Sequence, residues 1–171
     1  NAFANPTIIN CTFTLNSTVN DGGGMFNYTS SPTLTNCKFT NNSAREGGGM
    51  DTTQGSNPTL TDCMFTNNSA PSGGGMANSS SSSPALTNCT FKDNSSDYGG
   101  GMYNSFCSPT LTYCTFTDNS ANYYGGGMRN SSNCNPTLTN CTFTDNSAEL
   151  GSGIYNISSS SPSLTDCTFT E

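Results

Sequence analysis

The side chains that could carry chemistry are few, and most of them recur at regular intervals. The 171 residues include nine cysteines, eleven carboxylates and four basic residues, with no histidine. Proton-transfer and sugar-cleaving enzymes need clustered carboxylates, usually beside a base, whereas these carboxylates are scattered. Zinc is disfavoured because there is neither a histidine nor a Cys-x-x-Cys pair. The sequence therefore predicts no catalytic residue, no metal site and no cofactor, and we expect the protein not to be an enzyme.

The acidic residues contain one sparse file, formed by Asp93, Asp118 and Asp145. Carboxylate oxygens are ligands that calcium prefers, so this file is the best candidate for a calcium site. A solvated edge is the interpretation that we favour.

Seven of the nine cysteines keep a constant interval and two do not. Buried free thiols behave as small hydrophobic side chains, and we favour this role for the regular seven. Cys107 and Cys134 lie outside the interval, in the segments SFCSPT and SNCNPT. We predict that these two form a disulfide that clamps two loops, which implies an oxidising, extracellular compartment. The regular cysteines are Cys11, Cys37, Cys63, Cys89, Cys114, Cys141 and Cys167.

A repeat of about 26 residues must position all of these side chains. Proline recurs in the pattern N-P-T-L-T-N-C-T-F with steps of 26, 26, 26, 25, 27 and 26 residues. Phenylalanine follows each regular cysteine by two residues, and methionine follows most of the glycine triplets. Such a period is typical of solenoids, in which stacked units bury a core that no single unit buries alone. The units begin near Pro6, Pro32, Pro58, Pro84, Pro109, Pro136 and Pro162.

Each unit contains three short strand-like pieces, PTLT, CTFT and GGGMYN. Alternation along them directs Leu, Cys, Phe and Met inward. The odd spacing between Leu34 and Cys37 requires a corner at Asn36, since Asn tolerates left-handed backbone. We therefore predict an all-β fold, a single-stranded parallel β-helix of about six and a half coils that forms one solenoid over residues 1–171.

Stacking of the coils places identical side chains above one another. Phenylalanine rings can stack in an offset arrangement. An amide has a donor and an acceptor, so stacked asparagines can bond along the rod. The predicted ladders are Asn16, Asn42, Asn68, Asn94, Asn119 and Asn146, and Phe39, Phe65, Phe91, Phe116 and Phe143.

The outward side chains offer three further chemistries. Asn27, Asn78 and Asn130 lie in N-x-S/T sequons and are candidate glycosylation sites. Outward tyrosines (Tyr103, Tyr123, Tyr124 and Tyr155) suggest glycan binding. Threonine ranks resemble those of antifreeze proteins, although Ala85 and Ser163 interrupt one rank and threonine suits any exposed strand. The candidate ice-binding residues are Thr33, Thr35, Thr59, Thr61, Thr110, Thr112, Thr137 and Thr139.

Charge and hydropathy exclude two classes of partner. The net charge of −7, with four basic residues, provides no basic stripe for nucleic acid or anionic lipid. No apolar run approaches the roughly 20 residues of a membrane helix, so we expect no direct membrane insertion. The chain starts and stops inside a repeat. We expect either a longer array or self-association through open solenoid ends.

The spacing Phe-x-x-Asn, as in Phe39 to Asn42 and Phe65 to Asn68, followed by a Gly-Gly motif, resembles the repeats of chlamydial polymorphic outer-membrane proteins. It also resembles right-handed parallel β-helix repeat proteins of bacterial surfaces. That family favours GGA followed by Ile, Leu or Val, whereas GGGM dominates here and only Gly153-Ile154 comes near. The resemblance implies right-handed coiling and an exported or surface protein. We therefore expect a stalk, adhesin or head-to-tail filament, with ice binding and glycan or carbohydrate activity as alternatives and host or matrix glycans as partners.

Overall fold

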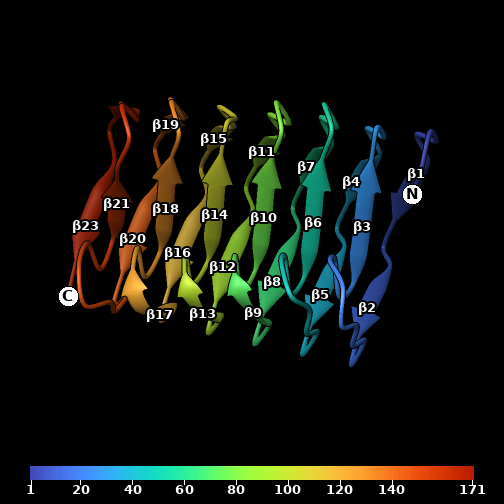
Figure 1. The fold of residues 1–171 in the computed structure, drawn as a ribbon, viewed down its shortest axis with the longest axis horizontal. Helices are drawn as coiled ribbons and strands as arrows, with labels where there is room; N and C mark the ends of the chain where they lie inside the picture. Colours follow the sequence, from blue (N-terminus) through green and yellow to red (C-terminus); the bar gives the residue numbers. More distant parts are fainter.

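The computed structural model describes residues 1–171 as a rod of stacked coils. All 23 regular elements are β-strands, and every strand pairs in parallel with its equivalent in a neighbouring coil. Figure 1 shows the coils side by side, from the N-terminus in blue to the C-terminus in red. No helix is present that is long and apolar enough to cross a membrane. The prediction of a right-handed parallel β-helix is confirmed.

Three long sheets form the walls of the rod. The TLT sheet contains β1 (Thr7–Ile9), β4 (Thr33–Thr35), β7 (Thr59–Thr61), β11 (Ala85–Thr87), β15 (Thr110–Thr112), β19 (Thr137–Thr139) and β22 (Ser163–Thr165). The TFT sheet contains β2 (Thr12–Thr14), β5 (Lys38–Thr40), β8 (Met64–Thr66), β12 (Thr90–Lys92), β16 (Thr115–Thr117), β20 (Thr142–Thr144) and β23 (Thr168–Thr170). The methionine sheet contains β3 (Met25–Tyr28), β6 (Met50–Thr53), β10 (Met76–Ser79), β14 (Met102–Ser105), β18 (Met128–Ser131) and β21 (Ile154–Asn156).

A fourth, short sheet adds to the three strands per coil that the sequence predicts. It contains β9 (Ser69–Ser72), β13 (Ser95–Tyr98) and β17 (Ser120–Tyr124). Single bridges such as Ser17↔Ser43 and Ser43↔Ser69 continue this line toward the N-terminus. The segment between the Asn ladder and the glycines is therefore a wall of the rod, because its backbone also pairs with the neighbouring coil.

The register of the sheets places like residues above one another throughout the core. Leu34 pairs with Leu60, and Phe39 pairs with Phe65. Successive phenylalanine rings from Phe13 to Phe169 stack with centroids 4.6–4.9 Å apart and interplanar angles of 2–8°. Leucine, cysteine, phenylalanine and methionine together form one buried cluster of 20 residues. The thin core is thus continuous along the rod axis.

The corners have the left-handed backbone expected of Asn36, whose φ is 50°. The same corner in every coil has φ between 50° and 56°, including Asp62 and Tyr113. A second left-handed residue precedes each member of the Asn ladder, as at Asn67 with φ 54°. These two turns redirect the chain from the TLT sheet to the TFT sheet and then to the short sheet.

The glycine triplets form the corner before the methionine sheet. In the second coil Gly47 has φ 59°, which a side chain rarely adopts. A Cβ on Gly49 would lie 2.6 Å from the Gly75 carbonyl oxygen and 2.8 Å from the Phe65 ring. Glycine is therefore required both for the turn and for the close approach of successive coils.

Candidate functional site

The buried asparagines of the first ladder bond to one another and to the backbone. Each Nδ2 from Asn16 to Asn119 donates to the Oδ1 of the next coil at 2.9–3.0 Å. From the second coil on it also donates to a phenylalanine carbonyl at 2.8–2.9 Å. Each Oδ1 from Asn42 to Asn146 further accepts the backbone N–H of the preceding ladder residue at 3.0–3.1 Å. The prediction of an Asn ladder from Asn16 to Asn146 is confirmed.

A second ladder on the methionine sheet contains Asn27, Asn78 and Asn130, which the sequence proposed as glycosylation sites. All three side chains are 0% exposed. Asn78 donates to Asn104 at 2.9 Å, and Asn130 donates to Asn156 at 2.8 Å. The glycosylation prediction is wrong for the folded rod, because a buried amide cannot carry a sugar. The Met-x-Asn spacing could have predicted this burial, since residues two apart on a strand point to the same face and the Met points inward.

Cys107 and Cys134 lie in the turns between the methionine sheet and the TLT sheet, where both are buried. They are 5% and 0% exposed, and their sulfurs are 3.7 Å apart as free thiols. The Cys107 N–H donates to the Cys134 sulfur at 3.1 Å. The hydrogen bond with Cys134, together with burial, raises the pKa of the Cys107 thiol. The predicted position between strands is confirmed, the cysteines are buried there, and the disulfide stays a prediction.

The two cysteines replace serines in a column whose hydroxyls accept backbone N–H groups from the preceding coil. The Ser30 N–H donates to the Ser56 hydroxyl at 2.9 Å, and the Cys134 N–H donates to the Ser160 hydroxyl at 3.1 Å. Sequence reasoning missed this column because the serine-rich segment resembles a loop. The column consists of Ser30, Ser56, Ser82, Cys107, Cys134 and Ser160.

The regular cysteines are free thiols along the core. Cys63 and Cys89 donate to the carbonyls of Thr61 and Thr87, at 3.3 and 3.4 Å. Burial is the largest cause that raises the pKa of Cys37. These thiols pack as small side chains that also satisfy a corner carbonyl.

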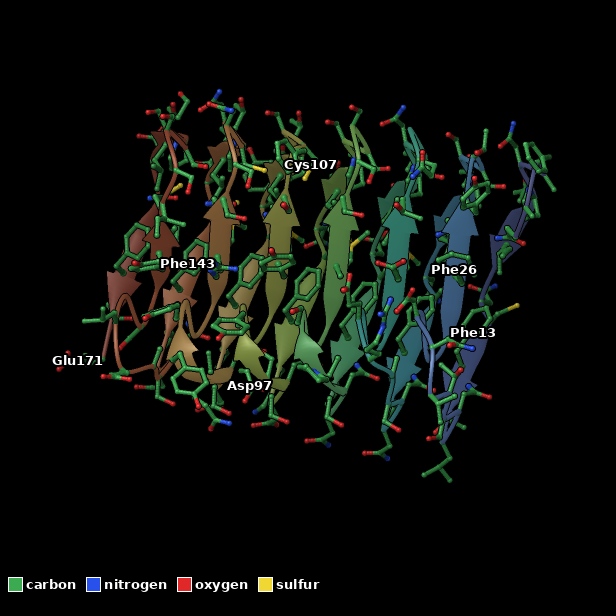
Figure 2. The ribbon with its side chains drawn as sticks, in the orientation of Figure 1. Phe13, Phe26, Asp97, Cys107, Phe143 and Glu171 are labelled. Carbon is green, nitrogen blue, oxygen red and sulfur yellow. The ribbon has the colours of Figure 1, made fainter.

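The outer threonines form ranks on the TLT sheet, with one residue of each rank per coil. Thr33, Thr59 and Thr110 are exposed in the first rank, which Ala85 interrupts. On the neighbouring TFT sheet Met64 is 41% exposed and breaks the regular pattern. Figure 2 shows how densely polar groups cover the outside of the rod. Ice binding through Thr33, Thr35, Thr59, Thr61, Thr110, Thr112, Thr137 and Thr139 stays a prediction.

Two carboxylates of the aspartate file lie beside a lysine. The Lys92 ammonium lies 3.6 Å from an Asp118 carboxylate oxygen and 4.0 Å from one of Asp93. No three His, Cys, Asp or Glu side chains are grouped so that they could hold a metal ion. These contacts favour a solvated, partly neutralised edge.

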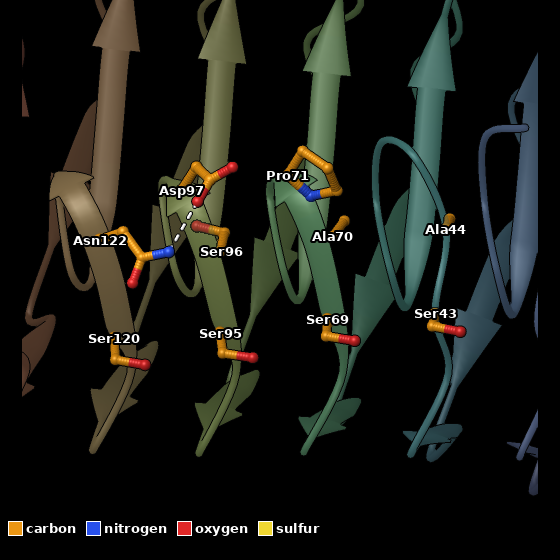
Figure 3. Close-up of a pocket in the computed structure, with 10 residues that line it drawn as sticks. All are labelled: Ser43, Ala44, Ser69, Ala70, Pro71, Ser95, Ser96, Asp97, Ser120 and Asn122. Atoms are coloured by element: carbon orange, nitrogen blue, oxygen red, sulfur yellow. Dashed lines mark hydrogen bonds between the residues drawn. The ribbon is translucent and has the colours of Figure 1, made fainter. Parts of the chain in front are cut away.

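A polar groove of about 460 Å³ runs along the short sheet across four coils (Figure 3). Its repeated element is a serine file, one residue per coil, which comprises Ser43, Ser69, Ser95 and Ser120. Asn122 donates to Asp97 at 2.7 Å, and both side chains line the groove together with Pro71. The Asn-Ser pair that opens this segment in most coils was visible in the sequence, but its concave arrangement was not.

Beside this groove, tyrosines from three successive coils gather around one arginine. The Arg129 guanidinium carbon lies 5.0 Å from the Tyr98 ring centroid and 5.1 Å from that of Tyr103. Tyr124 and Tyr155 stack at 4.7 Å. The structure thus brings together the predicted Tyr103, Tyr123, Tyr124 and Tyr155, and it adds Tyr98 and Arg129, which sequence reasoning missed.

A sequence family described as "Right handed beta helix region" matches residues 1–105, which is more than half of the chain. The chain belongs to the right-handed β-helix family. No curated protein and no solved structure shows significant similarity to it. The later coils of this right-handed β-helix keep the same register, since Leu111 pairs with Leu138 and Phe116 pairs with Phe143. The serine column and the tyrosine–arginine cluster extend into these later coils.

Proposed function

We propose that this right-handed β-helix is a structural rod of an extracellular or cell-surface protein, such as a stalk or adhesin, and that it is not an enzyme. The observation that carries the proposal is the unbroken stacking of the core. Phenylalanine stacks from Phe13 to Phe169, and the Asn ladder bonds from Asn16 to Asn146. Because each coil is hydrogen-bonded to the next along the axis, the rod resists bending and keeps its surface files aligned.

Three features support an extracellular location. The outer surface is rich in Ser, Thr and Asn and low in charge. The buried thiols of Cys107 and Cys134 are adjacent, which suits the disulfide that we predict in an oxidising compartment. The Phe-x-x-Asn and Gly-Gly spacing resembles that of the chlamydial polymorphic outer-membrane proteins, and this likeness favours a surface role.

We further propose that the 171-residue chain, alone in solution, associates end to end. The terminal coils are paired on one side only, and unpaired strand edges are templates for further strands. At the C-terminal coil Leu164 is 42% exposed and Phe169 is 48% exposed, although the same columns are buried inside the rod. A second copy that extends the sheets would cover these residues.

Negative-stain electron microscopy and sedimentation velocity over a range of concentrations test both proposals. We expect straight rods that lengthen with concentration. Leu164→Lys should reduce this growth, because a charge would be buried in the junction. Met64→Lys is the matched control, since Met64 is 41% exposed and lies on β8, which pairs with a strand on both sides.

Two results would contradict the proposals separately. Wild-type protein that stays monomeric at every concentration would exclude end-to-end association and leave the rod intact. Flexible or globular particles would exclude the rod itself.

A further inference from the structure

We infer that the tyrosine–arginine cluster binds an oligosaccharide that carries a carboxylate. The inference goes beyond the proposed rod function and does not depend on it. The cluster is defined as Tyr98, Tyr103, Tyr123, Tyr124, Arg129 and Tyr155.

The cluster presents aromatic surface on three successive coils. The Tyr98 ring lies 5.5 Å from Tyr123 and 5.8 Å from Tyr124, measured between centroids. Tyr123 is 46% exposed, and the other four rings are half-buried. Tyrosine combines a flat apolar face with a hydroxyl group, and a pyranose ring likewise has an apolar C–H face and a rim of hydroxyls. An aromatic platform with polar rims therefore suits a sugar.

Arg129 gives this platform a positive charge that the protein leaves unpaired. The close ion pairs of the chain involve Arg45 and Lys92, and no carboxylate lies within 4.0 Å of Arg129. Its Nε is buried and has no hydrogen-bond partner. The guanidinium is held over Tyr98 and Tyr103 by cation–π contacts.

A guanidinium held on aromatic faces has its N–H groups oriented for a carboxylate, which it can bind with two parallel hydrogen bonds. A neutral sugar would leave this charge unmatched. Arg129 therefore selects an acidic sugar unit over a neutral one.

The adjoining groove extends the site along the rod. Asp97 and Asn122 line the groove and directly precede Tyr98 and Tyr123 in the chain. Its serine hydroxyls and the Asn122 amide suit sugar hydroxyls, whereas Asp97 disfavours a second carboxylate. The geometry thus places the acidic unit at Arg129 and neutral hydroxyl groups toward the groove.

Isothermal titration with short acidic glycans tests the inference. The probes are trigalacturonate, triguluronate and sialyllactose, with galactotriose as the neutral counterpart. We expect at least one acidic probe to bind with a Kd on the order of 1 mM or lower, and galactotriose to bind at least about tenfold more weakly. Added salt should lower the affinity for the acidic probe, because salt screens the attraction between the guanidinium and the carboxylate.

Substitutions separate recognition from packing. Arg129→Met keeps an apolar side chain under the rings and should lower the affinity for the acidic probe about tenfold or more. Arg129→Lys retains the positive charge but not the two parallel hydrogen bonds, so it should lose only part of that affinity. Arg45→Gln removes a positive charge from the same rod and should leave binding unchanged. Thermal melts of every variant report whether the rod stays folded.

Three outcomes would overturn the inference. The first is that none of the three acidic probes binds. The second is that galactotriose or a tri-glutamate peptide binds as tightly as the best acidic glycan. The third is that folded Arg129→Met binds that glycan as the wild type does, in which case the cluster has only a packing role.

Discussion

Replacing Asn68 by alanine tests whether the ladder holds the rod together. The Asn68 side chain is 0% exposed and takes part in four hydrogen bonds. It donates to the Phe39 carbonyl at 2.9 Å and to the Asn94 oxygen at 3.0 Å. It accepts from the N–H and the Nδ2 of Asn42, each at 3.0 Å. The substitution removes all four.

The expected loss follows from these contacts. Four hydrogen bonds at about 0.5–1.5 kcal/mol each give about 2–6 kcal/mol. The Asn42 N–H is left buried without its acceptor, which by itself costs about 1–3 kcal/mol. We therefore expect Asn68→Ala to lower the free energy of unfolding by about 3–5 kcal/mol.

Asn16→Ala is the matched control at the edge of the same ladder. The exposed Asn16 side chain makes one hydrogen bond, to the Asn42 oxygen at 2.9 Å, and its loss should cost about 0.5–1.5 kcal/mol. Urea denaturation followed by far-ultraviolet circular dichroism gives both values. Hydrogen exchange reports the Asn42 amide directly, which should lose protection in Asn68→Ala. Equal costs for the two variants, or an Asn42 amide that stays protected, would refute the reasoning.

Three more predictions concern a buried acid, a glycine corner and the paired thiols. Burial, with the nearby Asp21 and Glu46, raises the pKa of Asp51 to about 8. Folded protein therefore binds more protons than unfolded protein above about pH 4, and stability should fall by about 1.4 kcal/mol per pH unit up to about pH 8. Asp51→Asn should flatten this slope in melts at different pH values. An unchanged slope would show that another group causes the pH dependence. Gly49→Ala places a methyl group 2.6 Å from a neighbouring carbonyl oxygen and should cost several kcal/mol in urea denaturation, about 3 or more. Gly55→Ala, which has open space but φ +71°, should cost about 1 kcal/mol, and equal losses would exclude the close approach as the cause. Oxidation should join Cys107 to Cys134, with an intact mass lower by two hydrogens that reduction reverses, whereas replacing both by serine should change stability by about 1 kcal/mol or less because serine occupies the same column elsewhere. A mass unaffected by oxidant would disprove the bridge.

The sequence predicted the architecture because its apolar residues repeat with the same period as the coil. A strand that places Leu34 inward must place Leu60 above it, and the odd step from Leu34 to Cys37 requires a corner. Asn36 occupies that corner with the left-handed backbone that its residue type suggested. Such inferences need only local geometry and the repeat.

The candidate sites depended on whether particular side chains point into the core or to solvent, which the local sequence did not reveal. Asn78 lies in a sequon, but its place two residues after Met76 on a strand turns it into the core. Cys107 lies in a serine-rich turn between two strands, yet it is buried there and bonded to the next coil. Composition was misleading at both places, because a polar residue can be buried where stacked copies satisfy it.

The sequence by itself determined the period, the inward files of Leu, Cys, Phe and Met, and the first Asn ladder, because repetition forces equivalent residues into register. Arg129 occupies the same register position as Tyr103 and Tyr155, so the repeat by itself aligns these three residues. Only the tertiary structure decided that Tyr98 and Tyr124 also meet the Arg129 guanidinium. Tyr98 and Tyr124 lie in the segment before the glycine triplet, where the sequence differs from coil to coil, so their contacts depend on how the glycine corner turns the short sheet toward the methionine sheet. That turn is set by close backbone contacts between coils, which are absent until the coils stack.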